Sequence, residues 1–324
     1  MSGLISAGSK LIVMPEVVAI VGPTASGKTA IAQSLAEILP RSGEIISADS
    51  MQIYRGMNIG TAKPSPAERT VPYHCIDLVD PGEPYSAALF QRAAREAIAR
   101  TLSAGHTPIV AGGTGLYVRA ALDDWEFPTG EQGAPVRVDL EQEAASAGAH
   151  AMHERLRSLD PASAALIHPN NLRRTIRALE MAAAGDSYED QASGFSKRRS
   201  VYDTVFIGLH VQREALYERI ELRVDAMMAG GLLDEVRTLL EAGLREGLTA
   251  PYAIGYKELV QVVEGVSDLT VAVDQIKQAT RRYAKRQMTW LRGDPRIRWI
   301  DVTESSPEDS IATIVDLVES HSPR

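Results

Sequence analysis

The sequence predicts an α/β fold: a parallel-sheet core that carries a phosphate loop (P-loop), with a helical insertion domain. Three observations lead to this prediction. Short apolar runs alternate with amphipathic helical stretches, a glycine-rich motif follows the first run, and one long stretch rich in helix formers contains no strand run. Strands that alternate with helices in this way form parallel sheets.

Five apolar runs predict the strands. Each is short and bounded by turn-forming residues, which is typical of a strand buried on both faces. The runs are residues 17–21, 44–48, 108–111, 205–209 and 297–300.

Two stretches have the period of a helix with one apolar face. The first follows Gly27, is expected to end near Pro40, and has its apolar residues at Ile31, Leu35, Ile38 and Leu39. The second stops at Gly230-Gly231 and has its apolar residues at Leu216, Ile220, Val224 and Met227.

Two breaks in this alternation delimit an insertion. Residues 127–130 and 133–135 are rich in turn formers, and residues 185–200 are polar without periodicity. Residues 136–184 are rich in Ala, Leu, Glu and Arg, which favours helices. We therefore expect a discontinuous core of residues 14–124 and 201–302, a helical insertion of 125–200 and terminal extensions of 1–13 and 303–324, with Met14 as an alternative start.

Composition limits the class of protein. Cys75 is the only cysteine, which excludes an intramolecular disulfide or a cysteine-based zinc module and makes a reducing compartment, the cytoplasm, the expected location. The net charge of −8 provides no overall attraction to a polyanion, so any such contact must be local. Pro15 and Glu16 interrupt the most apolar terminal run, which argues against a membrane span. Oligomeric state is left open, with a monomer favoured.

The glycine-rich motif after the first run matches the phosphate-loop pattern G-x-x-x-x-G-K-[ST] between a strand and a helix. Its backbone N–H groups are expected to face a diphosphate or triphosphate, with Lys28 as a point charge and the Thr29 hydroxyl on Mg²⁺. A plain glycine-rich turn is the alternative. The predicted phosphate-binding residues are Gly22, Pro23, Thr24, Ala25, Ser26, Gly27, Lys28 and Thr29.

Two polar residues follow other predicted strands. Asp49 ends the second strand, where ligand-facing groups gather in parallel sheets. Its position is equally compatible with a general base and with an N-cap or a carboxylate that organises Mg²⁺. Thr114 lies in a second glycine-rich loop. Two interpretations are open: a hydrogen bond from its hydroxyl to a leaving phosphate oxygen, or an ordinary turn residue.

Several segments together resemble the tRNA dimethylallyltransferase family, from about Val17 to about Asp301. The most specific is residues 48–64, ADSMQIYRGMNIGTAKP. The others, in order, are residues 22–29, 112–117, 167–170, 177–180, 219–228, 231–236 and 253–258.

The resemblance implies transfer of a dimethylallyl group from its diphosphate to N6 of the adenine beside the anticodon, position 37. Asp49 is then the base, and Lys28, Thr29 with Mg²⁺, Thr114 and Arg223 stabilise the leaving diphosphate. Ser50, Met51 and Gln52 match the loop that meets the target adenine, together with Asp49 and Thr114. Only the resemblance singles out Arg223; without it, Arg219 and Arg223 are best explained as two arginines on a solvated helix face.

Local basic clusters are the expected contacts to tRNA. The main one comprises Arg281, Arg282, Lys285 and Arg286 at helical spacing, followed by Arg292, Arg296 and Arg298. Arg173, Arg174 and Arg177 form a second cluster, with Arg137 as a weaker candidate; here Arg173-Arg174 replaces the family's Gln-Arg. A solvated helix surface is the alternative for these residues, and a third cluster, Lys197, Arg198 and Arg199, is left undecided.

Two other functions fit the motifs alone. A small-molecule or nucleotide kinase also combines a phosphate loop, a nearby Asp and Mg²⁺. A non-catalytic, nucleotide-switched RNA-binding protein would bind tRNA without turnover. ATP consumption without prenyl transfer would distinguish the kinase.

Overall fold

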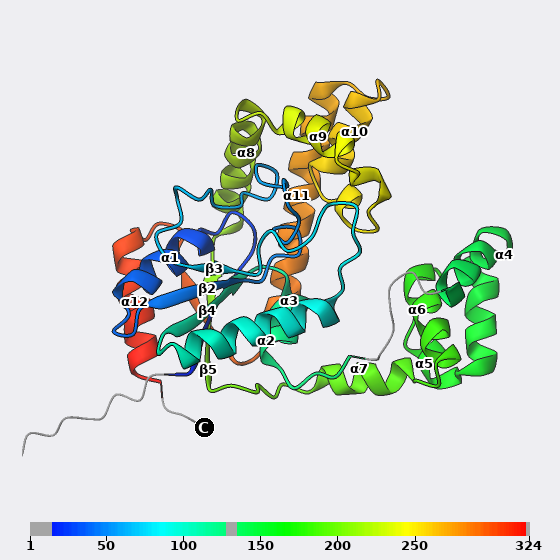
Figure 1. Ribbon diagram of the computed structural model, residues 1–324, viewed down its shortest axis with the longest axis horizontal. Coiled ribbons are helices and arrows are strands. Elements are labelled where there is room, and N and C mark those ends of the chain that lie inside the picture. The colour runs from blue at the N-terminus through cyan, green and yellow to red at the C-terminus, as the bar shows by residue number, and fades with distance from the viewer. Residues whose placement is uncertain (1–14, 128–134, 322–324) are drawn as a thin grey trace, which may run out of the picture. The chain divides into compact units, whose positions relative to one another are not determined.

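The computed structural model describes residues 15–127 and 135–321 (Figure 1). The chain folds into two compact units. The first contains described residues from both Met1–Leu122 and Ser200–Arg324, and the second is Asp123–Arg199. Met14, the expected extension 1–13 and most of the turn-rich stretch 127–135 lie outside the described residues. None of the helices among the described residues is long and apolar enough to cross a membrane.

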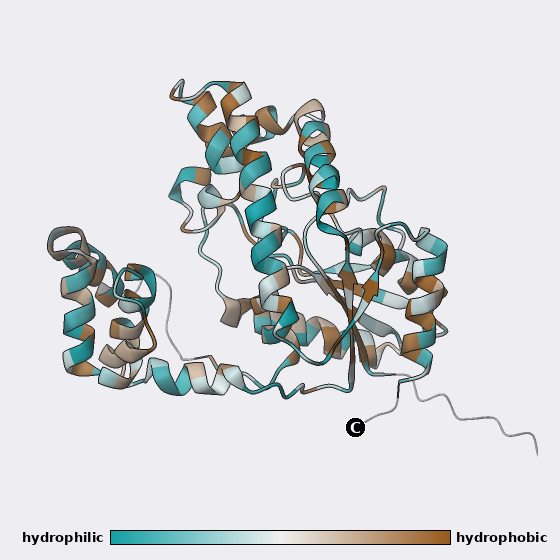
Figure 2. Ribbon diagram, turned by 180° about the vertical axis from the view of Figure 1, so that it is seen from behind, coloured by the Kyte–Doolittle hydropathy of each residue, from teal (hydrophilic) through white to brown (hydrophobic). Residues whose placement is uncertain are grey.

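The first unit is built on a parallel sheet with the strand order β3-β2-β4-β1-β5-β6. All five predicted strands are present, and their centres are apolar (Figure 2). The two-residue β3 was not predicted because it is too short to show a pattern. The strands are β1 (Val17–Val21), β2 (Gly43–Ser47), β3 (Tyr73–His74), β4 (Thr107–Gly112), β5 (Thr204–His210) and β6 (Ile297–Asp301).

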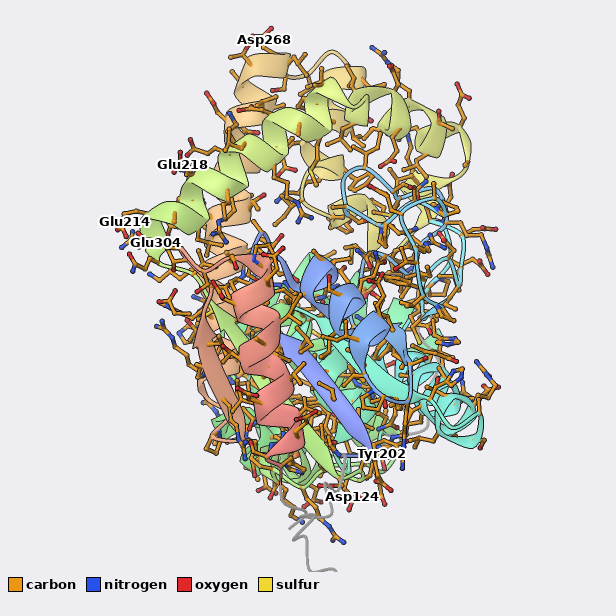
Figure 3. The ribbon with its side chains drawn as sticks, turned by 90° about the vertical axis from the view of Figure 1, so that its left-hand side faces the viewer. Asp124, Tyr202, Glu214, Glu218, Asp268 and Glu304 are labelled. Carbon is orange, nitrogen blue, oxygen red and sulfur yellow. The ribbon has the colours of Figure 1, made fainter. Side chains whose placement is uncertain are left out.

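Helices surround this sheet. Figure 3 shows α12 beside α1 over the strands, and these two helices also contact each other. The helices of this unit are α1 (Lys28–Ile38), α2 (Ala87–Ser103), α3 (Gly115–Leu122), α8 (Arg213–Ala229), α9 (Leu232–Glu241), α10 (Tyr256–Val263), α11 (Leu269–Arg292) and α12 (Pro307–Glu319), with 3₁₀ turns at Leu244–Glu246 and Ala250–Tyr252.

The apolar face of α1 differs from the prediction at one residue. Ile31 and Leu35 are buried, whereas Ile38 is 53% exposed. The helix ends at Ile38, and Leu39 has extended dihedral angles that turn its side chain into the core. The period therefore predicted the buried face correctly except at Ile38, the last residue of the helix.

The segment after residue 302 is not an extension. Residues 307–319 form α12, whose Ile314 and Val318 are fully buried in the same core cluster as Leu35. Ser306 caps this helix by accepting a hydrogen bond from the Asp309 N–H (3.0 Å). The expectation of a terminal extension from 303 was wrong because a single apolar stripe at helical spacing is enough to dock a short helix.

The second unit is helical, as predicted for residues 136–184. Its helices are α4 (Pro135–Leu159), α5 (Pro161–Ala165), α6 (Leu172–Ala183) and α7 (Tyr188–Ser196), and α4 is broken at Gly148, where φ is 81°. The expectation that residues 185–200 are irregular was wrong, because Tyr188–Ser196 form α7. Ser187 caps this helix by accepting a hydrogen bond from the Asp190 N–H. Since α7 has no buried residue, it leaves no apolar period in the sequence.

Candidate active site

The phosphate loop connects β1 to α1 as predicted. Gly27 adopts the left-handed conformation (φ 85°) that lets the chain turn into the helix, a conformation that costs glycine little. The Lys28 ammonium folds back and donates to the Pro23 carbonyl oxygen at 2.5 Å. The lysine side chain therefore bonds to the backbone of its own loop.

The surroundings of Lys28 lower its pKa. Burial, and then the neighbouring Arg223 guanidinium, lower the pKa of Lys28 to about 7, and the Asp49 carboxylate opposes this shift. An ammonium whose solvation is poor and which faces another cation gains most from a bound anion. The site is thus electrostatically prepared for a phosphate group.

Adjacent strands bring Asp49 and Thr114 together. The Ala48 N–H donates to the Ala111 carbonyl (2.8 Å), and the Ser50 N–H donates to the Thr114 hydroxyl oxygen (3.2 Å). Asp49 accepts a hydrogen bond from the Met51 N–H (2.9 Å), so its carboxylate also stabilises the turn. No helix of the described residues begins at Asp49, so the N-cap alternative does not apply; its carboxylate stabilises a turn and borders the site.

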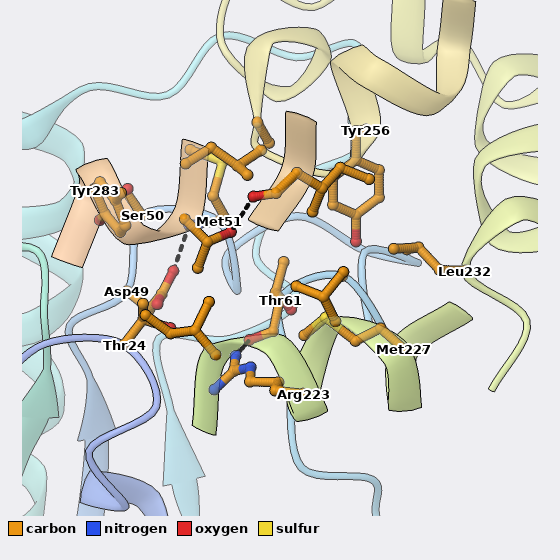
Figure 4. Close-up of a pocket in the computed structure, with 18 of the residues that line it drawn as sticks. Thr24, Asp49, Ser50, Met51, Thr61, Arg223, Met227, Leu232, Tyr256 and Tyr283 are labelled. Carbon is orange, nitrogen blue, oxygen red and sulfur yellow. Dashed lines mark hydrogen bonds between the residues drawn. The ribbon is translucent and has the colours of Figure 1, made fainter. Parts of the chain in front are cut away.

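Arg223 and Arg219 do not share a solvated face. Arg219 donates to the carbonyl oxygens of Val302 and Thr303 (3.2 and 2.7 Å), whereas Arg223 reaches toward the Thr61 carbonyl (3.5 Å). Figure 4 shows the Arg223 side chain directed from α8 into the cavity. Burial lowers the pKa of Arg223 and the Asp49 charge raises it. Only Arg223 is placed to act in the site.

Two adjoining cavities meet at these residues. A polar one of about 80 Å³ is bordered by the phosphate loop, including Lys28 and Thr29. A larger, mainly apolar one of about 270 Å³ is bordered by Met227, Leu232 and Tyr256 (Figure 4). The residues that line both cavities are Thr24, Asp49, Thr61, Arg223 and Tyr283.

Comparison with known proteins assigns this arrangement to a family. The model of the family described as IPP transferase matches residues 52–294, and that of isopentenyl transferase matches residues 15–71. This chain belongs to the IPP transferase family. It is accordingly a transferase.

The relatives cover nearly the whole chain. A tRNA dimethylallyltransferase of Geobacillus kaustophilus is 48% identical over 90% of this chain and 91% of the relative. One of Streptomyces coelicolor is 47% identical over 88% and 90%, respectively.

Solved structures have the same fold. The tRNA isopentenylpyrophosphate transferase of Bacillus halodurans is 41% identical, with a TM-score of 0.68 over 94% of this chain and 97% of that chain. A eukaryotic dimethylallyltransferase acting on tRNA is 28% identical, with a TM-score of 0.78 over 95% and 80%. The family match thus extends over both the sheet and the helical insertion.

The loop expected to meet the adenine is divided between two environments. Ser50 and Met51 line the apolar cavity. Gln52 is buried, accepts a hydrogen bond from the Ser47 hydroxyl (2.8 Å), and donates to the carbonyl oxygens of Thr61 and Ala62 (3.3 and 3.4 Å). Protein groups satisfy its amide, so Gln52 supports the loop, and it also lines the polar cavity.

The basic residues of α11 are also divided. Arg282, Lys285 and Arg286 are exposed, and Arg286 borders the apolar cavity. Arg281 is half-buried and forms an ion pair with Glu221 (2.8 Å). The first three are free to contact a phosphate backbone, whereas Arg281 would first have to leave its partner.

The same division is found in the insertion. Arg173 and Arg174 are exposed on α6. Arg177 and Arg137 both lie against the buried Glu180 carboxylate, at 2.9 and 3.5 Å. The Arg177–Glu180 pair lies within α6, whereas Arg137 reaches from α4 to Glu180 and so stabilises the packing of α4 on α6.

Sequence reasoning did not identify Tyr283, Gln287 and Tyr256 as site residues. Tyr283 lines both cavities, and burial followed by the Asp49 charge raises the pKa of its hydroxyl to about 12. Gln287 lines the polar cavity and Tyr256 the apolar one. Tyr283 and Gln287 lie within the basic stretch of α11, four residues apart and so on one side of the helix. This spacing is the sequence pattern that could have identified them.

Proposed function

We propose that this transferase moves a dimethylallyl group from dimethylallyl diphosphate to N6 of adenosine 37 of tRNA and releases diphosphate. The N6–C1 bond forms, the bond between C1 and the diphosphate oxygen breaks, and the proton of N6 leaves to a base. The relatives named as tRNA dimethylallyltransferases support this reaction class.

The observation that carries the proposal is the junction of a polar and an apolar cavity. A prenyl diphosphate has one charged end and one apolar end, so it requires these two environments side by side. The bond that breaks lies between the two ends, where Asp49 and Arg223 line both cavities. The apolar wall that includes Met227 and Leu232 suits the dimethylallyl end of this donor.

Each residue at this junction has a chemical task. Asp49 accepts the N6 proton, a step for which a well-placed base contributes about 10²–10⁴-fold. Lys28, Arg223, the loop N–H groups and the Thr114 hydroxyl stabilise the charge that develops on the diphosphate. Ser50 and Met51 border the space into which the adenine must turn out of its stack, at a cost of a few kcal/mol.

The site also fits Mg²⁺. Thr29 is exposed at the start of α1 and lines the polar cavity with Asp49. No group of three or more His, Cys, Asp or Glu that could hold a metal occurs in the described residues. This donor set suits Mg²⁺, which commonly takes one or two protein ligands and completes its shell with phosphate oxygens and water. Bound through Thr29, the ion would neutralise diphosphate charge.

The exposed cations of α11 and of α6 are proposed to contact the tRNA backbone. They are Arg282, Lys285 and Arg286 on α11, and Arg173 and Arg174 on α6. Local clusters reconcile a polyanionic substrate with the net charge of −8. A cytoplasmic, monomeric enzyme is part of the same proposal.

Mass spectrometry of tRNA nucleosides tests the function. After incubation with an anticodon stem-loop and dimethylallyl diphosphate, adenosine 37 should gain one dimethylallyl group. A parallel reaction contains ATP in place of the prenyl donor. ATP consumption without prenyl transfer would establish the kinase, and RNA binding without either turnover would establish the nucleotide-switched binding protein.

A further inference from the structure

Glu235 lies outside both cavities, yet it holds a turn that forms their wall. Its Oε2 accepts hydrogen bonds from the N–H groups of Asn58 and Ile59 (3.1 and 2.7 Å). Its Oε1 accepts from the Gly60 N–H (3.2 Å) and from the Tyr256 hydroxyl (2.7 Å). Four donors from two distant segments therefore converge on one carboxylate of α9.

The carbonyl groups of Asn58 and Ile59 accept hydrogen bonds from the backbone N–H groups of Lys63 and Ala62, whereas the N–H groups of residues 58–60 all point to Glu235. Successive N–H groups that point the same way form a site for an anion, here the carboxylate. Gly60 lies so close to Tyr256 that a Cβ atom would be 2.6 Å from its ring. The carboxylate thus fixes the turn and the tyrosine against each other.

The other side of this turn faces the site. The Thr61 carbonyl oxygen accepts hydrogen bonds from Arg223 Nη2 (3.5 Å) and Gln52 Nε2 (3.3 Å). Thr61 lines both cavities, and the Tyr256 ring lines the apolar one (Figure 4). The carbonyl that Arg223 contacts thus belongs to the residue that directly follows the 58–60 turn.

We propose that Glu235 is a positioning residue for the transfer reaction: its carboxylate holds the 58–60 turn and Tyr256 so that the Thr61 carbonyl directs Arg223 toward the leaving diphosphate. The inference rests on the proposed function, because it assigns Arg223 to that diphosphate. Neither Glu235 nor the 58–60 turn needs to touch the reacting atoms.

Glu235→Gln is the sharpest variant. The variant keeps the shape of the side chain and one acceptor oxygen. Its NH₂ group replaces the other oxygen and cannot accept hydrogen bonds from the donors that face it. At saturating tRNA and prenyl donor, the single-turnover rate constant should fall about tenfold, the scale of losing a hydrogen bond to a charged group. The single-turnover amplitude and the tRNA affinity should stay near wild type. The matched control is Glu241→Gln, which removes the same charge from an exposed position of α9 and should change neither quantity.

A double-variant cycle separates positioning from a merely structural role. If Glu235 acts through Arg223, adding Glu235→Gln to Arg223→Gln should change the rate constant by less than about twofold, because the group being positioned is already gone. A structural role predicts instead that the two losses multiply, or that the active fraction falls while the rate constant is unchanged. Either result overturns the proposal.

A second variant tests the proposal in case Glu235→Gln folds poorly. Tyr256→Phe removes one of the four donors without a charge change, and should lower the rate constant by a smaller factor with the same dependence on Arg223. A rate constant equal to wild type in both single variants would also overturn the inference. Failure of wild-type protein to prenylate tRNA would instead refute the proposed function, so the two failures are distinguishable.

Discussion

The side-chain oxygen of Gln287 accepts a hydrogen bond from the backbone N–H of Thr24 at 2.8 Å. The Gln287 Nε2 atom donates a hydrogen bond to the Gly113 carbonyl oxygen (2.9 Å). A Cβ atom on Gly113 would lie only 2.3 Å from Gln287 Nε2, so a larger residue would not fit there. One buried side chain of α11 therefore joins the phosphate loop to the loop that carries Thr114. The helix expected to bind RNA is thereby connected to the site expected to bind the donor.

Gln287→Glu should disturb donor binding. The variant can still accept from Thr24, but it loses the hydrogen bond to Gly113 and places a negative charge beside the polar cavity. The KM for dimethylallyl diphosphate should rise about tenfold or more, the scale of an unfavourable charge contact in a buried site. Steady-state kinetics measures this, and Gln278→Glu, exposed on the same helix, is the control. An unchanged KM would mean that the link does not shape the donor site.

The pKa of Lys28 predicts a pH dependence. It is lowered from 10.5 to about 7, so free protein loses this proton as the pH rises through 7. Because a bound diphosphate favours the ammonium form, binding above pH 7 must take up a proton, and the affinity should weaken by up to about tenfold per pH unit. Calorimetric titration between pH 6.5 and about 9 measures both effects.

Lys28→Ala is the matched control for that pH dependence. Its donor affinity should be weaker at neutral pH while tRNA binding stays nearly intact, and the additional pH dependence should disappear. Ionisation of the donor itself is common to both proteins and cancels in the comparison. Equal pH profiles for the two proteins would contradict a titrating Lys28.

Asp49→Asn tests the base. The amide keeps the shape of the carboxylate and can still accept from the Met51 N–H, so the turn is preserved. The amide cannot accept the N6 proton, so the single-turnover rate should fall by about 10²-fold or more with both substrates bound. Near-native chemistry would leave Asp49 with the turn as its only role.

The cations of α11 should differ in their effect on salt dependence. Replacing Arg282 and Lys285 with Gln should make the log–log slope of tRNA affinity against salt shallower by about one to two units, at about 0.9 per phosphate contact. Arg281→Gln should have a smaller effect, because Arg281 is paired with Glu221. Filter binding at several salt concentrations measures the slopes. A larger effect of Arg281 would show that its ion pair opens on the RNA.

The α12 helix should contribute to global stability. Ile314 is fully buried in the core cluster of the sheet, so Ile314→Ala should lower the free energy of unfolding by about 2–5 kcal/mol. Urea denaturation followed by circular dichroism measures this. The exposed Thr313→Ala is the comparison on the same helix and should cost far less.

The sequence alone determined the parallel-sheet core, the phosphate loop, the helical insertion and the family. These features depend on local patterns: apolar runs, helical periods, and the motif from Gly22 to Thr29, whose spacing needs no knowledge of distant residues. The α12 helix and α7 were missed because one has a short apolar stripe and the other has none. The helices α2, α9 and α10 were not predicted individually either, although each has buried apolar residues on one face.

Only the tertiary structure decided which polar residues face the site. Arg219 and Arg223 have the same type and helical spacing, yet one binds carbonyl oxygens after β6 and the other enters the cavity. Gln52, Arg177 and Arg281 were expected to contact RNA. Gln52 lines the polar cavity with its amide hydrogen-bonded to protein groups, and the two arginines form ion pairs within the protein. Glu235 and Gln287 act between segments more than a hundred residues apart. A hydrogen bond depends on distance and direction between side chains, and the fold sets these by bringing distant segments together.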